Sequence, residues 1–344
     1  MTPTWRMQRE ILEQSTKFSQ RLDAWMTEAR PLREQILRRD QLVVLGRGSS
    51  RHAGIYAAYL YGLATGRHAV EFRLWMTTRK VPRVDWSNTA VLALSASGRS
   101  TDVARASKWL AERGSFVVGV TNADDDQCAL GEASSALFHL GVGGERAVPA
   151  TKSFNAQLLA CAALLGFELE AALPEVVASF QLMEEGTVPQ RLADLVQEAD
   201  SLAWIARGPS LAAACDAALK CREAARLEST GWSAAEFQHG HIGSFGSRDR
   251  AILLCDANQP AGSFSSVAKG LLNRRTPFAV VGLDFYRDNG GAAAPMLPIK
   301  LPPQRWARTP VFAYLSQQVA LELAIRKDLN PDDPVGLQKV TETQ

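Results

Sequence analysis

Three residues whose side chains can move protons lie close together in this sequence. Lys220 and Glu223 are three positions apart, and fifteen residues separate Glu223 from His239. An ammonium, a carboxylate and an imidazole are groups that general acid–base chemistry on a sugar requires. On a helix, Lys220 would lie one turn before Glu223, so the two side chains would share a face. This stretch therefore predicts a site for proton transfer.

Each of these residues also has a simpler explanation. A Lys-x-x-Glu pair is most often a surface salt bridge, and Lys339 alone is an ordinary lysine near the C-terminus. His239 could be a structural histidine, or it could bind a metal together with His241. Two histidines two positions apart, with no further ligands at a suitable spacing, are weak evidence for a metal.

A serine-rich turn follows the apolar segment 90–94 and leads into a predicted helix. It contains Ser95, Ser97, Gly98 and Ser100. Backbone N–H groups, hydroxyl donors and the positive end of a helix dipole together favour an anion. Gly98 would allow the backbone to approach a ligand closely. The turn therefore suits a phosphate group.

A second turn of this kind follows the apolar segment 42–45 and contains Gly48, Ser49 and Ser50. In a doubly wound sheet both turns would lie at the same carboxyl edge. Either turn alone is better explained by a serine that caps a helix. Two such turns at one edge favour phosphate binding.

The composition is that of a soluble globular protein with more than one core. At 344 residues the chain is long for a single domain and sufficient for two. Its 38 basic and 36 acidic side chains give a net charge of only +2. No overall field therefore favours nucleic acid or a membrane surface, and any preference for anions must be local.

The cysteines and the N-terminus favour the cytoplasm. The five cysteines form no CxxC pair and are odd in number, as expected of reduced thiols. The N-terminus has no apolar signal segment, and no apolar run is long enough to span a membrane. We therefore expect a cytoplasmic protein.

Short apolar runs alternate with helical patterns along the chain. Residues 5–38 carry apolar side chains at helical spacing and predict one or two amphipathic helices. Continuous apolar strands between helices are typical of a parallel sheet with helices on both faces. The strands predicted in the first half are 42–45, 90–94, 116–120 and 136–140, with helices from about residues 50, 101 and 150.

The same order returns about 160 residues later, which predicts a domain duplication. Asp256 stands in the second half where Ser95 stands in the first, so we expect phosphate at the first-half loops and not at 256–259. The repeated segments are 203–210, 251–254 and 278–282. The predicted domains are an N-terminal arm (1–38), a first domain (39–172), a helical connector (173–199), a second domain (200–328) and a C-terminal tail (329–344).

Six motifs occur together in a specific order and spacing. They are Arg47-Gly48-Ser49-Ser50, Ser95-x-Ser97-Gly98, Ala150-Thr151-Lys152-Ser153-Phe154, Ala218-Leu219-Lys220-x-x-Glu223, Glu236-x-x-His239-Gly240 and Leu337-x-Lys339-Val340-Thr341. From about Met7 to Lys339 the chain resembles the sugar isomerase (SIS) family. It is most similar to the double-SIS isomerase module of glucosamine-6-phosphate synthase and to the stand-alone type II glucosamine-6-phosphate deaminases and fructosamine-phosphate deglycases. The resemblance implies an α/β fold of two tandem flavodoxin-like or Rossmann-like SIS domains, each a parallel sheet flanked by helices.

The resemblance also implies a role for each candidate residue. His239 would assist ring opening, and Glu223 would move the proton between C1 and C2. Lys220 would position the open chain, and Lys339 would close over the site from the tail. No metal and no cofactor is expected. The expected substrate- and phosphate-binding residues are Gly48, Ser49, Ser50, Ser95, Ser97, Gly98, Ser100 and Val148.

The expected activity is aldose–ketose isomerisation coupled to loss of an amine, foremost from glucosamine 6-phosphate to fructose 6-phosphate and ammonia. Thr2 stands where the synthase's glutaminase domain has its nucleophilic cysteine, so neither that domain nor glutamine is expected. In the family the histidine comes from the partner subunit, which implies a homodimer; nucleic acid and membranes are not expected partners. A fructosamine-6-phosphate deglycase, a galactosamine-6-phosphate deaminase and a non-catalytic sugar-phosphate sensor remain alternatives.

Overall fold

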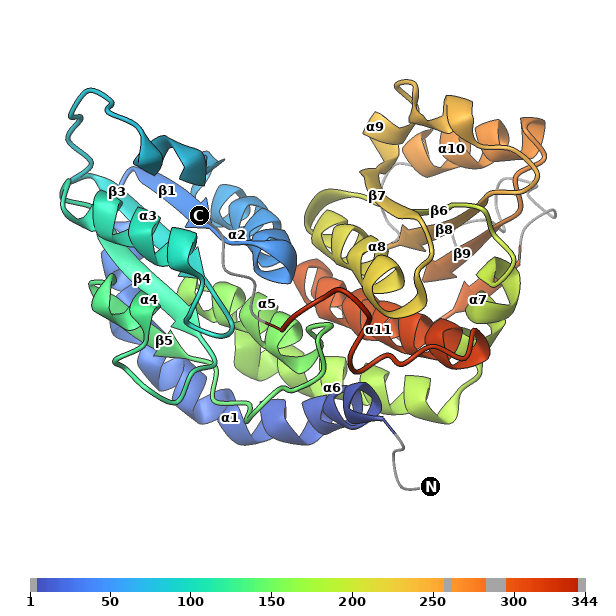
Figure 1. The fold of residues 1–344 in the computed structure, drawn as a ribbon, viewed down its shortest axis with the longest axis horizontal. Helices are drawn as coiled ribbons and strands as arrows, with labels where there is room; N and C mark the ends of the chain where they lie inside the picture. The colour runs from blue at the N-terminus through green and yellow to red at the C-terminus, as the bar shows by residue number, and fades with distance from the viewer. Residues whose placement is uncertain (1–4, 257–261, 283–294, 340–344) are drawn as a thin grey trace. The chain divides into compact units, whose positions relative to one another are not determined.

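The computed structural model describes residues 5–256, 262–282 and 295–339 (Figure 1). The chain divides into two compact units, each with one five-stranded sheet. The first unit comprises residues 16–146, 150–173 and 338–344, and the second comprises residues 1–15, 147–149 and 174–337. The five-part domain division expected from the sequence stays a prediction.

The sheet of the first unit is parallel, with the strand order β2-β1-β3-β4-β5. The direction of winding reverses between β1 and β3, as in doubly wound sheets. A single long helix, α1 (Arg6–Leu37), precedes the sheet and begins in the second unit. The elements that follow it are β1 (Gln41–Leu45), α2 (Gly48–Thr65), β2 (Ala69–Glu71), η1 (Leu74–Thr78), β3 (Thr89–Leu94), α3 (Thr101–Ala111), β4 (Phe116–Thr121), α4 (Ala129–Glu132), β5 (Ala136–His139) and α5 (Lys152–Leu164).

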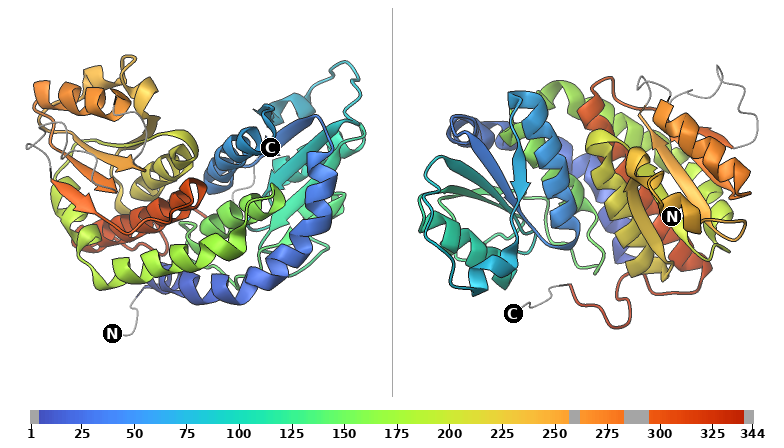
Figure 2. Two further views of the ribbon diagram at one scale, coloured as in Figure 1. Left: turned by 180° about the vertical axis from the view of Figure 1, so that it is seen from behind. Right: turned by 90° about the horizontal axis from the view of Figure 1, so that it is seen from above.

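Helices cover both faces of this sheet (Figure 2). Side chains of a strand alternate between its faces. Val91 of β3 packs in one apolar cluster with Val103 and Leu110 of α3. On the other face, Gly54 of α2 approaches Val44 of β1. All six residues of β3 are buried, which explains why its sequence is continuously apolar.

The sheet of the second unit has the same order, read as β7-β6-β8-β9-β10, and it is also parallel. One face is covered by α9 and α10, whose apolar residues cluster with those of β6 and β8. The elements of this unit are α6 (Leu169–Glu185, beginning in the first unit), α7 (Val188–Val196), β6 (Leu202–Ala206), η2 (Gly208–Ser210), α8 (Leu211–Ala225), β7 (Ser229–Ser233), α9 (Ala234–Phe237), η3 (His241–Ser244), β8 (Arg250–Cys255), α10 (Gly262–Asn273), β9 (Phe278–Gly282), β10 (Met296–Pro298), η5 (Arg305–Ala307) and α11 (Arg308–Arg326).

The α/β class and the two parallel sheets expected from the sequence are confirmed. Three strands that the sequence analysis did not predict are β2, β7 and β10, and each lies at the edge of its sheet. They are short and largely half-buried or exposed, so they lack the continuous apolar run of a central strand. The shared strand order is compatible with a duplication, which stays a prediction.

Apolar segments of this chain are buried within the units. All thirteen residues of α5 are buried, and residues 158–164 are all apolar, whereas the first half of the helix also buries Lys152, Ser153, Asn155 and Gln157. Across the described residues, no helix combines the length and the apolar character that a membrane crossing needs. The five cysteines are free thiols, and Cys161, Cys221 and Cys255 are buried.

Candidate functional site

The two serine turns lie side by side at the carboxyl edge of the first sheet. Strands β1 and β3 are parallel neighbours, and the winding reverses between them, where doubly wound sheets bind their ligands. The Arg47 side chain, from the turn after β1, donates through Nε to Asp102 Oδ2 in the first turn of α3, at 2.7 Å. The expected juxtaposition of the two turns is therefore present.

Both helices that start at these turns begin without a side-chain cap. The residue at the cap position is Arg47 for α2 and Ser100 for α3, and neither side chain bonds to its helix. Instead, Ser95 Oγ donates to Ser100 Oγ at 3.1 Å. The first backbone N–H groups of a helix need an acceptor from elsewhere. Capping by the side chain at the cap position is therefore absent at both turns, and the binding of an anion there stays a prediction.

The turn after β3 requires glycine at position 98. Gly98 has φ +66°, a left-handed conformation that side chains rarely adopt, and its N–H donates to the Ser95 carbonyl at 3.0 Å. A Cβ atom here would lie 2.6 Å from Cys128 Sγ and 3.1 Å from Thr121 Oγ1. The backbone of the turn therefore packs directly against the neighbouring loop after β4.

In the turn after β1, Ser50 is held by a hydrogen bond from α5. Ser49 and Ser50 are 9% exposed, and Gln157 Nε2 donates to Ser50 Oγ at 3.0 Å. Gly48 has φ +52°, which lets the chain turn sharply into α2. The Ser50 hydroxyl is therefore fixed in place.

A cavity of about 670 Å³ opens beside the turn after β3. Lys339 of the tail and Ser97 both line this cavity, and the expected role of Lys339 in closing over the site stays a prediction. The tail residues Val340 and Thr341 lie outside the described residues. The lining residues are Ala96, Ser97, Arg99, Asn122, Ala123, Asp124, Asp125, Gln127, Cys128, Ala129, Gly144, Glu145, Ser153 and Lys339.

Glu145 is a residue of this cavity that sequence reasoning missed. Its side chain is 3% exposed and accepts a hydrogen bond from Lys339 Nζ at 2.7 Å. Burial alone would raise the pKa of the Glu145 carboxyl, but the Lys339 charge and hydrogen bonds from Lys339 and Ser153 bring that pKa down to about 2. The motif Thr151-Lys152-Ser153, six residues downstream of Glu145, was the available signal.

Ser97 gives a direct test of this edge of the sheet. Ser97→Ala removes a hydroxyl that would bond a phosphate, so we expect binding of a sugar phosphate to weaken by about 1.5–3 kcal/mol. Isothermal titration with glucosamine 6-phosphate measures the change. Ser87→Ala is the matched control, because Ser87 precedes β3 at the opposite edge of the sheet. Equal affinities of Ser97→Ala and wild type would contradict the assignment.

In the second unit, the predicted Lys220–Glu223 pair exists on α8. Lys220 Nζ donates to Glu223 Oε2 at 2.5 Å. The Lys220 side chain is 1% exposed and that of Glu223 is 20% exposed. A surface salt bridge is therefore the wrong description, since the ammonium is buried and only the carboxylate reaches solvent. The buried Lys220 ammonium orients the Glu223 carboxylate through a charge-assisted hydrogen bond.

His239 lies in an exposed turn after α9, where its backbone N–H donates to the Glu236 carbonyl at 2.9 Å. The neighbouring His241 ring stacks on Trp232 of β7, with 3.5 Å between ring centroids. His241 thus has a packing role, and the metal explanation for the histidine pair gains no support from this contact. Val148, also expected at the site, belongs to the second unit and donates its N–H to the Asp332 carbonyl at 2.8 Å.

The corresponding edge of the second sheet differs from the first. Pro209 in the turn after β6 has no N–H to offer an anion. Asp256 follows β8, and Arg305 lies 3.8 Å from its carboxylate. Burial raises the pKa of the Asp256 carboxyl, while Arg305 and Arg308 oppose that rise. Repulsion of anions by Asp256 is therefore weaker than expected from sequence; residues 257–259 lie outside the described residues.

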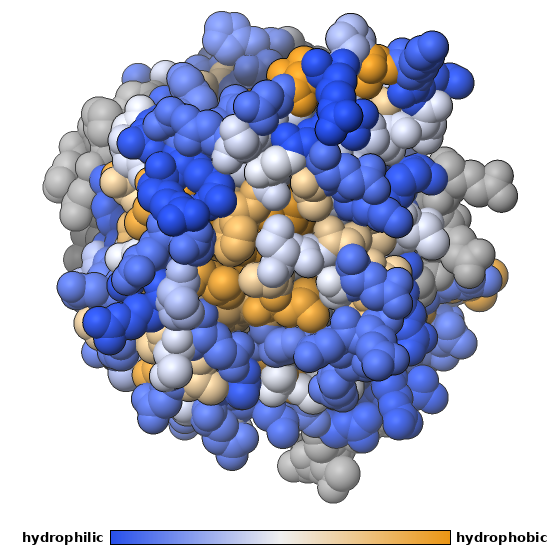
Figure 3. All heavy atoms as spheres, turned by 90° about the vertical axis from the view of Figure 1, so that its left-hand side faces the viewer, coloured by the Kyte–Doolittle hydropathy of each residue, from blue (hydrophilic) through white to orange (hydrophobic). Residues whose placement is uncertain are grey.

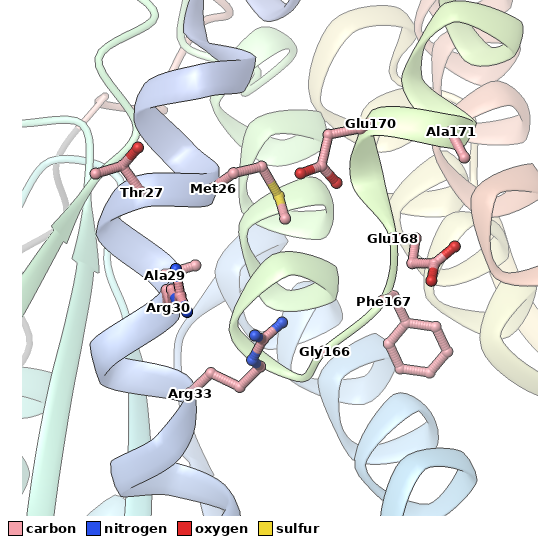
Figure 4. A pocket seen from close by; sticks show the side chains of 10 residues that line it. All are labelled: Met26, Thr27, Ala29, Arg30, Arg33, Gly166, Phe167, Glu168, Glu170 and Ala171. Atoms are coloured by element: carbon pink, nitrogen blue, oxygen red, sulfur yellow. The ribbon is translucent and has the colours of Figure 1, made fainter.

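A second hollow of the first unit lies between α1 and the turn that joins α5 to α6 (Figure 4). It has a volume of about 720 Å³, and charged residues of both signs line it, including Arg30, Arg33, Glu168 and Glu170. None of the residues singled out in the sequence lines it.

Apolar residues also gather in the middle of the face drawn in Figure 3. Such gathering is typical of surfaces that another molecule covers.

Residues 35–166 match the model of the SIS domain family, and this range contains both serine turns. Over 97% of its length the chain is 22% identical to glutamine–fructose-6-phosphate aminotransferase (isomerizing) of Sulfurisphaera tokodaii, of which it covers 56%. The chain thus spans about half the length of the curated relatives it matches.

Solved structures share the fold over nearly the whole chain. The C-terminal domain of glucosamine-fructose-6-phosphate aminotransferase from Francisella tularensis superposes with a TM-score of 0.84 at 17% identity, covering 97% of this chain and 99% of that one. Glucosamine-6-phosphate deaminase from Thermotoga maritima has a TM-score of 0.75 at 18% identity, covering 98% and 100%. The expected resemblance to the SIS family is confirmed.

Proposed function

We propose that this chain, whose residues 35–166 match the SIS domain family model, is an enzyme that acts on a hexose 6-phosphate bearing an amine. It isomerises the sugar between aldose and ketose and releases the amine. Glucosamine 6-phosphate is the foremost substrate, with fructose 6-phosphate and ammonia as products. Fructosamine 6-phosphate and galactosamine 6-phosphate are the nearest alternatives.

The observation that carries this proposal is the pair of uncapped helices, α2 and α3, at the switch point of the first sheet. The backbone N–H groups at the start of these helices and the nearby hydroxyls of Ser50 and Ser97 suit the three oxygens of a phosphate. The Arg47–Asp102 ion pair neutralises its own charge, so N–H and O–H donors carry the binding. A sugar phosphate meets these requirements.

The proton transfer falls to Glu223. Once the ring is open, glucosamine 6-phosphate has an aldehyde at C1 and an amine at C2. Glu223 takes the proton from C2 and returns it to C1, which leaves a ketose with an imine at C2. Water then adds to C2, and ammonia leaves. Buried Lys220 supports this role because its ammonium, 2.5 Å from Glu223 Oε2, holds the carboxylate in one orientation.

His239 and Lys339 complete the proposed site. An imidazole can accept the hydroxyl proton and protonate the ring oxygen, which is what ring opening needs. The exposed position of His239 supports a role at the surface of its unit, where a partner subunit can receive it. Lys339 lines the same cavity as Ser97, which supports its action from the tail.

A screen for amine release tests the proposal. Purified protein is incubated with each of the three amino-sugar phosphates, with and without glutamine, and ammonia and the product sugar phosphate are measured. We expect ammonia from at least one substrate, at a rate that glutamine does not change. Binding without amine release or isomerisation would favour a sugar-phosphate sensor in place of an enzyme.

Subunit mixing tests whether the site is shared in a homodimer. Glu223→Gln and His239→Ala should each be inactive alone. After subunit exchange, one of the two sites in a mixed dimer would contain both native residues, so we expect activity to return to as much as half that of a wild-type dimer. Native mass spectrometry confirms the exchange. Proven exchange without recovery would place both residues in the site of a single chain.

A further inference from the structure

Glu145 gathers five hydrogen bonds on one buried carboxylate. Oε1 accepts from the backbone N–H groups of Thr151 and Ser153, at 2.9 and 3.0 Å, and from Thr151 Oγ1 at 3.2 Å. Oε2 accepts from Ser153 Oγ at 2.6 Å and from Lys339 Nζ at 2.7 Å. Four of the five donors thus belong to the start of α5, and the fifth comes from the C-terminal tail.

The four donors from α5 fix the position of the carboxylate. Thr151 precedes the first residue of α5, and its own side chain does not cap the helix. Glu145 takes over that task, since a carboxylate at a helix N-terminus satisfies the free N–H groups and interacts favourably with the helix dipole. Thr151 is fully buried and Ser153 is 1% exposed. Glu145 therefore belongs to the rigid part of the first unit.

The other partner in the ion pair with Glu145 is Lys339 of the C-terminal tail. Lys339 is separated by 194 positions from Glu145, and its side chain is 31% exposed where that of Glu145 is 3% exposed. Both residues line the cavity beside Ser97. The Glu145 carboxylate is buried and held in place, whereas the Lys339 ammonium is partly exposed. The carboxylate therefore provides a fixed binding site for the ammonium.

We infer that Glu145 is the docking point of the C-terminal tail and the residue that positions Lys339 at the wall of the sugar-phosphate cavity. Docking itself follows from the ion pair and the helix cap. Its importance for turnover rests on the function proposed above. Glu145 acts through Lys339 and is a positioning residue.

Limited proteolysis measures docking without any substrate. Trypsin cleaves after Lys339 only when that side chain leaves Glu145 and enters the protease, so the rate follows the undocked population. In Glu145→Gln we expect this cleavage, followed by intact-mass spectrometry, to be about tenfold faster or more than in wild type. Glu175→Gln is the matched control, because Glu175 pairs with Lys300 at 3.0 Å away from the tail. Equal rates in wild type and Glu145→Gln would overturn the inference.

A second variant avoids the helix cap. Lys339→Gln leaves Glu145 and its bonds to α5 intact, and we expect faster hydrogen–deuterium exchange in the tail peptide, residues 330–344. Lys300→Gln should leave that exchange unchanged. Exchange of the tail that is the same in Lys339→Gln and wild type would overturn the inference, even if Glu145→Gln does not fold.

Kinetics then link docking to turnover. If Glu145 acts through Lys339, the single variants Glu145→Gln and Lys339→Gln should lower kcat by similar factors, and the double variant should be no worse than either. Losses that multiply in the double variant would contradict a positioning role. A wild-type protein that resists trypsin at Lys339 yet releases no amine would keep the docking and reject the proposed function.

Discussion

Glu223→Gln is expected to lower turnover about a hundredfold or more while leaving substrate binding nearly unchanged. Glutamine keeps the shape of the side chain and can still accept a hydrogen bond from Lys220. It cannot take up the proton that must leave a sugar carbon. Steady-state rates of amine release give kcat, and isothermal titration with the substrate gives the dissociation constant.

Glu322→Gln is the matched control for this experiment. Glu322 also lies on a helix of the second unit and pairs with a cation one turn away, since Arg326 Nε lies 2.9 Å from its carboxylate. We expect this variant to turn over at the wild-type rate. A Glu223→Gln protein that is folded and turns over within a few-fold of wild type would assign the base to another residue.

The stability of the first unit is expected to fall steeply in acid because of Glu145. The pKa of its carboxyl is about 2 in the folded protein and about 4.5 in the unfolded chain. A group whose pKa is lowered by folding stabilises the fold at any pH above its unfolded value. That stabilisation is lost as the pH falls from about 4.5 to about 2, and it amounts to about 3 kcal/mol at most. Chemical denaturation at a series of pH values measures the loss.

Lys339→Gln separates the contribution of the tail from that of other carboxylates. Without the Lys339 ammonium the folded-state pKa of Glu145 should rise, so the variant should be less stable than wild type at pH 7. The difference should shrink as the pH falls and vanish only well below about pH 2, where Glu145 is protonated in both proteins. Lys300→Gln, which breaks an exposed pair, should show little difference at any pH. A difference between Lys339→Gln and wild type that does not change with pH would contradict this account.

The central strands and the edge strand β5 were predictable from sequence, and the edge strands β2, β7 and β10 were not. Strands β1, β3, β6 and β8 are buried on both faces, so burial imposes a continuous apolar run that can be read directly. β7 reads Ser-Thr-Gly-Trp-Ser and is mostly half-buried. An edge strand of this kind is held by hydrogen bonds to its single neighbour, and backbone hydrogen bonds leave no pattern in the sequence.

The candidate site divides in the same way. Spacing placed Lys220 and Glu223 on one helical face, and the 2.5 Å contact confirms that geometry. No local pattern connects Glu145 with Lys339, since 194 positions separate them. Their contact depends on where the fold brings the tail. The role of His239 and the membership of Val148 in the site remain predictions.

The division of the chain into two units matters for the design of sequence libraries. The serine turns and the cavity beside them belong to the first unit, whereas the Lys220–Glu223 pair sits on α8 of the second unit. The sequence of loop 95–100 can therefore be varied while every residue of the helix that carries the pair is kept. A library confined to residues 96 and 99 would keep the hydroxyls of Ser97 and Ser100 that are proposed to bind phosphate, and Gly98, whose backbone is crowded, would stay unchanged.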